Sequence, residues 1–131
     1  MKVLVDTSVW SLALRRKTLN STSEKLINLI RASQVVLIGP VRQELLSGIS
    51  DDKVYSSLQS KLRPFDDLPI TTFDYEIAAK FFNTCRSKGI QGSHIDFLIC
   101  AVAANNGLQI FTTDKDFDLF AKHLPIRLFE A

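Results

Sequence analysis

The sequence predicts an α/β domain with three layers, in which a mainly parallel sheet lies between two layers of helices. One observation is a set of short apolar runs rich in valine and isoleucine, such as residues 2–5 and 35–38, typical of strands buried on both faces. Another is that segments with helical spacing of apolar residues lie between these runs, and such alternation implies right-handed crossovers. With no repeat or linker, we expect residues 1–131 to form a single α/β/α sandwich.

The expected strands are four apolar runs, each closed by a turn residue or an acid. They are residues 2–5, before Asp6; residues 35–38, before Gly39-Pro40; residues 110–113, before Asp114; and residues 126–129. Residues 70–73, after Pro69, are a weaker candidate for a fifth strand.

The expected helices occupy the intervals between these runs. Pro40 suits the first turn of a helix that continues through Glu44 to Leu46, and residues 51–62 form another before Pro64. The remaining helices are indicated by apolar faces at Val9 and Leu12; Leu26, Leu29 and Ile30; Ala78, Phe81, Phe82 and Cys85; Ile95, Leu98, Ile99 and Val102; and Phe117, Phe120, Ala121 and Leu124.

Composition narrows the classes of function. The net charge is +2, which is compatible with a nucleic-acid partner but weaker than the basic footprint of a pure binding module. No apolar run approaches the roughly 20 residues that span a bilayer, and the amino end does not resemble a signal peptide, so we expect a cytoplasmic protein. Cys85 and Cys100 fall at apolar helical positions and are expected to be buried, reduced thiols.

Four acids occupy equivalent places in the expected fold. Asp6 and Asp114 each end a strand, Glu44 lies early in the helix after the second strand, and Asp96 lies in the first turn of the helix before the third. The carboxyl ends of parallel strands meet at one edge of the sheet, where ligands bind. We therefore expect the four carboxylates to converge in one pocket.

Each acid also has a simpler explanation. Asp6 and Asp114 could cap the helices that follow them, Asp96 fits a capping box with Ser93, and Glu44 could be a solvated helix carboxylate. That all four are only helix-start acids is the less economical explanation.

Clustered carboxylates repel one another unless a proton or a cation neutralises them. An oxygen-only set suits a hard ion, Mg²⁺ or Mn²⁺, and one or two such ions would activate water and stabilise charge on a phosphate during phosphodiester cleavage. Thr7, Ser8 and Thr112 offer hydroxyls that could hold a carboxylate in place, although capping explains Ser8 equally well. Asp116 could reach the metal or only stabilise the start of its own helix.

Four segments resemble the motifs of PIN-domain proteins, in particular the VapC-type toxins of toxin–antitoxin pairs. They are residues 5–10 (VDTSVW), 40–48 (PVRQELLSG), 96–103 (DFLICAVA) and 112–117 (TTDKDF), in the family's order. Cys100 stands where the family commonly has alanine, a small-for-small change.

The resemblance implies a PIN fold and Mg²⁺- or Mn²⁺-dependent endoribonuclease activity with water as the nucleophile. It also implies a homodimer, RNA as the substrate, and a small antitoxin as the protein partner. Contact with operator DNA would then be made only through this antitoxin. By resemblance, the metal-site acids are Asp6, Glu44, Asp96 and Asp114, with Asp116 as a less constant fifth and Thr112 as a supporting hydroxyl.

Basic and apolar residues suggest further contacts. Arg15, Arg16, Arg42 and Lys115 lie near the acids in sequence and are candidates for RNA phosphates, although Arg15 and Arg16 could equally be a solvated helix end. The amino-terminal helices and residues 54–62 carry more apolar residues than one face needs, so we expect an exposed apolar groove for a partner helix or strand.

Other classes fit less well. A receiver-type phosphoacceptor module would need adjacent acids after the first strand, but Thr7 follows Asp6. A phosphatase of the haloacid-dehalogenase kind would need an acid at Ser8. A PIN scaffold that is catalytically silent and binds only RNA or protein remains the main alternative.

Overall fold

The sheet is four-stranded and entirely parallel. The computed structural model describes residues 2–15 and 20–130, apart from the side chain of Arg15. The strands are β1 (Val3–Val5), β2 (Val35–Val36), β3 (Gln109–Phe111) and β4 (Arg127–Leu128), in the spatial order β2-β1-β3-β4. β1 is therefore an inner strand, with Val3 opposite both Val35 and Gln109.

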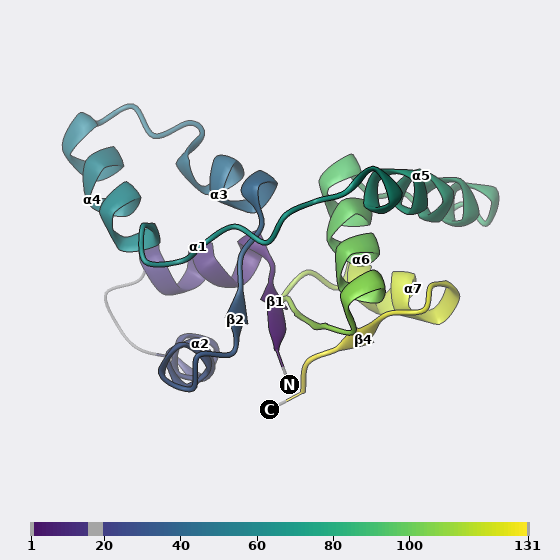
Figure 1. The fold of residues 1–131 in the computed structure, drawn as a ribbon, viewed down its shortest axis with the longest axis horizontal. Helices are drawn as coiled ribbons and strands as arrows, with labels where there is room; N and C mark the ends of the chain where they lie inside the picture. Colours follow the sequence, from purple (N-terminus) through teal and green to yellow (C-terminus); the bar gives the residue numbers. More distant parts are fainter. Residues whose placement is uncertain (1, 16–19, 131) are drawn as a thin grey trace.

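Helices cover both faces of this sheet. The helices are α1 (Thr7–Arg15), α2 (Ser21–Arg31), α3 (Gly39–Leu46), α4 (Asp52–Leu62), α5 (Thr72–Ser87), α6 (His94–Asn106) and α7 (Asp116–His123). In Figure 1, α1 to α4 lie on one side of the strands and α5 to α7 on the other. The predicted α/β class, with its parallel sheet and its helix in each expected interval, is confirmed. Among the described residues, no helix is long and apolar enough to cross a membrane.

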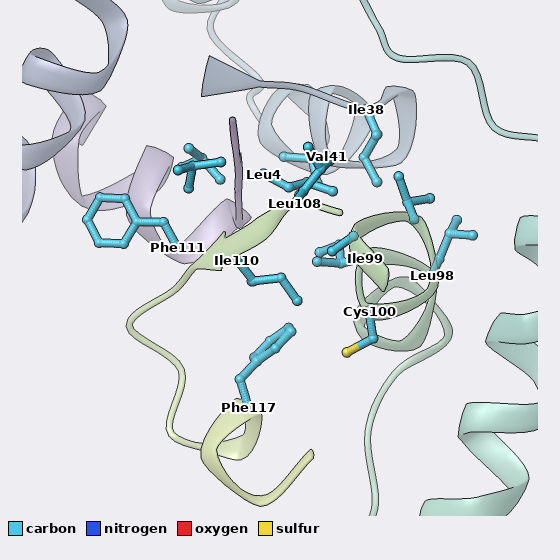
Figure 2. Close-up of a cluster of buried hydrophobic side chains, with 14 of the residues drawn as sticks. Leu4, Ile38, Val41, Leu98, Ile99, Cys100, Leu108, Ile110, Phe111 and Phe117 are labelled. Atoms are coloured by element: carbon cyan, nitrogen blue, oxygen red, sulfur yellow. The ribbon is translucent and has the colours of Figure 1, made fainter. Parts of the chain in front are cut away.

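Helix α6 is the central helix of the core. Seven successive residues, Phe97 to Ala103, are buried, because the sheet covers one side of the helix and α5 the other. Figure 2 shows Ile99 and Cys100 of α6 in the same cluster as Ile110 of β3 and Phe117 of α7. Cys100 and Cys85 are both free and buried. This packing fixes the amino end of α6, and with it Asp96, at the carboxyl edge of the sheet.

Residues 70–73 do not form the weaker strand that the sequence suggested. Thr71 instead caps α5: its hydroxyl accepts from the Asp74 amide at 3.3 Å, and its own amide donates to the Asp74 carboxylate at 2.9 Å. This capping box begins a helix within the run: Ile70 packs against the core, while Phe73 in the first turn of α5 is 58% exposed. The nearby strand-like contact is an isolated parallel bridge between Leu37 and Asp67.

Asp74 is also the link between α5 and α6. Only 3% of its surface is exposed, and Asn105 Nδ2 donates to Oδ1 at 2.8 Å. Burial alone would raise the pKa of this carboxyl, but the hydrogen bonds from Asn105 and Thr71 outweigh it, and the pKa is lowered.

Candidate functional site

Asp6 stands at the carboxyl end of β1 and is almost fully buried, with 5% of its surface exposed. Its amide donates to the Phe111 carbonyl at 2.8 Å, which places it beside the end of β3. Two hydroxyls, Ser8 Oγ and Thr112 Oγ1, each donate to Asp6 Oδ2 at 2.8 Å. One carboxylate oxygen is therefore held by side chains from opposite ends of the chain. Among the described residues, both donors to the Asp6 carboxylate are side-chain hydroxyls and none is a backbone amide, so helix capping does not explain this carboxylate.

Thr112 also connects Asp6 to Asp114. The Asp114 amide donates to Thr112 Oγ1 at 3.0 Å, while the Thr113 amide donates to Ser8 Oγ at 3.0 Å. The Asp116 amide in turn donates to Asp114 Oδ1 at 2.9 Å. These bonds tie the segment after β3 to the start of α1 and leave Asp114 Oδ2 without a donor among the described residues.

Asp96 lies in the first turn of α6 and forms the expected capping box. The Ser93 amide donates to Asp96 Oδ2 at 3.0 Å, and the Asp96 amide donates to Ser93 Oγ at 3.1 Å. Burial raises the pKa of Asp96; the Ser93 hydrogen bonds oppose this, and the negative charges of Asp6 and Asp114 raise it further. Asp96 thus lies close enough to Asp6 and to Asp114 for their charges to act on it.

Glu44 does not contribute to the raised pKa of Asp96. Its side chain is exposed on α3 and forms no hydrogen bond or salt bridge with a described residue. Asp116 contributes its amide, while its side chain is exposed. The charges of Asp6 and Asp114 act on Asp96, and the convergence of all four carboxylates in one pocket stays a prediction.

The donor chemistry of these acids fits a hard divalent cation. All three offer carboxylate oxygens, and their mutual repulsion is of the kind that a cation relieves. Across residues 2–15 and 20–130, however, no three His, Cys, Asp or Glu side chains lie close enough together to enclose a metal ion. The metal ligands therefore remain a proposal.

Of the three candidate hydroxyls, Ser8 and Thr112 contact the Asp6 carboxylate. Thr112 lies where it was expected, but Thr7 Oγ1 is buried and has no partner among the described residues. Ser8, which could equally have been a capping residue, contacts Asp6 in its place. The position of Ser8, two residues after an acid that ends a strand, could have indicated this contact. Helix α1 begins at Thr7, and its first turn brings residue 8 back towards the carboxylate.

Arg42 has a structural role that the sequence did not reveal. Its Nε donates to Asp67 Oδ1 at 2.9 Å, Nη1 donates to the Leu62 carbonyl at 3.0 Å, and Nη2 donates to the Phe65 carbonyl. The guanidinium thus anchors the segment after α4 to α3, and these contacts occupy three of its five donors. Of the other candidates, Lys115 is exposed beside Asp114, whereas Arg16 and the Arg15 side chain lie outside the described residues.

The sequence profile of the PIN domain matches residues 3–123 of the chain. The chain belongs to the PIN-domain family. Among curated relatives of this PIN-domain chain, ribonuclease VapC11 of Mycobacterium tuberculosis is 29% identical over 124 residues, which are 92% of each chain.

Solved structures share the fold at lower identity. The structure of VapBC2 from Rickettsia felis bound to a DNA fragment from its promoter has a TM-score of 0.78 and 20% identity, with 98% of each chain covered. VapBC-5 of Mycobacterium tuberculosis, a member of the VapBC family of toxin–antitoxin systems, has a TM-score of 0.71 and 17% identity over the whole of both chains. The predicted PIN fold is confirmed.

Proposed function

We propose that this PIN-domain chain is a divalent-metal-dependent endoribonuclease and the toxin of a toxin–antitoxin pair. The observation that carries the proposal is the group around Asp6. Two hydroxyls hold its carboxylate, and burial together with the charges of Asp6 and Asp114 raises the pKa of Asp96. Its relatives named as VapC ribonucleases support the same activity.

In this proposal Asp6, Asp96 and Asp114 hold one or two Mg²⁺ or Mn²⁺ ions, and Glu44 and Asp116 complete the set from the rim. A bound ion would acidify a water molecule and stabilise negative charge growing on the RNA phosphate. The chain itself fixes the geometry: Thr112 and Ser8 restrict the Asp6 carboxylate, and the capping box restricts Asp96. Lys115, exposed next to Asp114 in sequence, would contact a phosphate of the RNA.

The antitoxin binds, in this proposal, at an apolar groove between α1, α3 and α4. The groove has a volume of about 420 Å³ and includes Leu14, Leu45 and Val54, of which Val54 is 54% exposed. Lys53 and Lys61 also line it and form no salt bridge with a described residue. An amphipathic helix with apolar residues on one face and acids beside them complements this lining. The homodimer, and contact with operator DNA through the antitoxin alone, complete the proposal.

The direct test is cleavage of RNA by purified wild type and by Asp6→Asn and Asp96→Asn. Asparagine keeps the shape of each side chain and removes one negative charge, so both variants should remain folded and lose cleavage. Asp52→Asn is the matched control, because Asp52 is an exposed acid in the first turn of α4 and belongs to none of the proposed metal-site residues. Full activity in either site variant would contradict the assignment. Wild type that binds RNA without cutting it in Mg²⁺ or Mn²⁺ would favour the silent scaffold.

A further inference from the structure

A second pocket lies where the loop between α5 and α6 meets the core. Its volume is about 340 Å³, within the range of roughly 300–1,000 Å³ typical of small-ligand sites. Phe82 and Arg86 of α5 line one side, and Gln91 and Gly92 of the loop line another. The loop leads directly into α6, whose first turn carries Asp96, so the pocket lies at the same end of α6 as the acids.

The wall on α5 is built from flat groups. The guanidinium carbon of Arg86 lies 6.0 Å from the centre of the Phe82 ring. Phe82 is itself stacked on His94, with ring centres 5.1 Å apart and an interplanar angle of 14°. Arg86 makes no side-chain hydrogen bond or salt bridge with a described residue, so Phe82 orients the guanidinium while its donors remain available to a ligand.

The floor of the pocket has little freedom to move. A Cβ atom at Gly92 would lie 2.7 Å from the Phe120 ring and 2.9 Å from the Phe97 ring, so the loop backbone is packed directly on two buried aromatic side chains. Gln91 precedes this contact and brings an amide with both a donor and an acceptor to the pocket. The site therefore combines the planar guanidinium of Arg86, a fixed loop backbone and the side-chain amide of Gln91, which can form hydrogen bonds with the edge of a flat ligand.

We propose that this pocket binds an unpaired base of the RNA that the acids cut. Bases of single-stranded RNA stack on arginine planes and aromatic rings and are read through hydrogen bonds to their edges. Arg86 provides the stacking plane and Gln91 the edge contact. Lys88, exposed at the end of α5, adds a positive charge for the flanking phosphate. This inference rests on the proposed function, since it makes the pocket the base-recognition part of the same ribonuclease.

The test uses short single-stranded RNAs with 2-aminopurine at one position at a time, bound to full-length protein carrying Asp6→Asn so that the RNA stays intact. Binding at the correct position should raise the 2-aminopurine fluorescence, because the base leaves the RNA stack. Arg86→Ala should abolish this rise and lower the affinity roughly tenfold. Arg86→Lys keeps the charge and should still lose the rise, because lysine has no stacking plane. Gln91→Ala should change which base is preferred.

Arg31→Ala is the matched control, since Arg31 is an exposed arginine on α2, across the sheet from α5 (Figure 1). Equal losses of affinity in Arg86→Ala and Arg31→Ala, with no position-specific fluorescence, would overturn the pocket assignment and leave the ribonuclease proposal intact. Position-specific binding that depends on Arg86 supports the pocket. Failure of metal-loaded wild type to cut any bound RNA is a separate result, and it would contradict the proposed function alone.

Discussion

Valine in place of Thr112 keeps the branched shape of the side chain and removes the hydroxyl that links two acids. In the wild type this hydroxyl donates to Asp6 Oδ2 at 2.8 Å and accepts from the Asp114 amide at 3.0 Å. The substitution therefore deprives a nearly buried carboxylate of one of its two hydroxyl donors and leaves a backbone amide without its acceptor.

The expected cost follows from these two bonds. A hydrogen bond to a charged group contributes about 1.5–3 kcal/mol, and a neutral one contributes about 1 kcal/mol. Ser8 still holds Asp6, and Asp114 is only half-buried, so water replaces part of the loss. We expect the free energy of unfolding to fall by about 2 kcal/mol, which lowers Tm by on the order of 8 °C for a chain of this size. Cleavage should fall by about 10- to 100-fold, as is usual when a group that orients a metal-binding side chain is removed.

The assay pairs urea unfolding with the rate of RNA cleavage, and Thr112→Ser is the control because serine retains the hydroxyl. Thr112→Ser should stay within a few-fold of wild type in cleavage and close to it in stability. Thr112→Val with wild-type activity and stability would refute the argument that this hydroxyl organises the site.

Three further variants test separate parts of the structure. Asp96→Asn removes a carboxylate whose pKa is raised in the folded state, and it keeps an oxygen that accepts from the Ser93 amide. At pH 7 with EDTA, the Tm of this variant should equal or exceed that of wild type. A clear fall in Tm in thermal denaturation would contradict this. Asn105→Ala should cost about 2 kcal/mol at pH 7. The pKa of Asp74 is lowered in the folded state, so the charged carboxylate stabilises the fold above its unfolded-state pKa, and this stability is lost as pH falls through its folded-state pKa. In urea unfolding at pH 3, Asn105→Ala should therefore lower the free energy of unfolding by less than at pH 7. An equal loss at both pH values would argue against a role for the Asp74 charge. Arg42→Ala should lower the free energy of unfolding by about 1–2 kcal/mol and leave the RNA affinity, measured by fluorescence anisotropy, unchanged. A loss of RNA affinity without a loss of stability would identify Arg42 as an RNA contact.

The fold could be predicted because its signals are local. Apolar runs such as residues 2–5 and 110–113 were long enough to identify strands. Helical spacing located five of the described helices, and Pro40 and Pro64 indicated α3 and α4. The strand ends were less certain, because β2 and β4 have only two residues each and their pairing depends on neighbouring strands. Residues 70–73 were misassigned because the apolar run contains the cap of α5, and capping competes with strand propensity at that point.

The site was partly predictable for a related reason. Asp6, Asp96 and Asp114 could be placed at one edge of the sheet because each follows a strand or starts a helix next to it. Hydrogen bonds between distant residues carry no such local signal. Thr112 was inferred from its position two residues before Asp114 and by resemblance, but its bond to Asp6 required the β1–β3 pairing.

The roles of Arg42 and Asn105 could not be predicted at all. Each depends on a partner that only the folded chain brings near: Asp67 and the carbonyls after α4 for Arg42, and Asp74 on the neighbouring helix for Asn105.

The most direct test of the central claim is to cut a defined RNA with purified protein, with and without EDTA, and to analyse the ends of the products. The proposed site predicts that EDTA stops cleavage, that added Mg²⁺ or Mn²⁺ restores it, and that the products carry 5′-phosphate and 3′-hydroxyl ends because water is the nucleophile. Cleavage that persists in EDTA, or products with 2′,3′-cyclic phosphates, would contradict a metal-dependent hydrolysis at Asp6, Asp96 and Asp114.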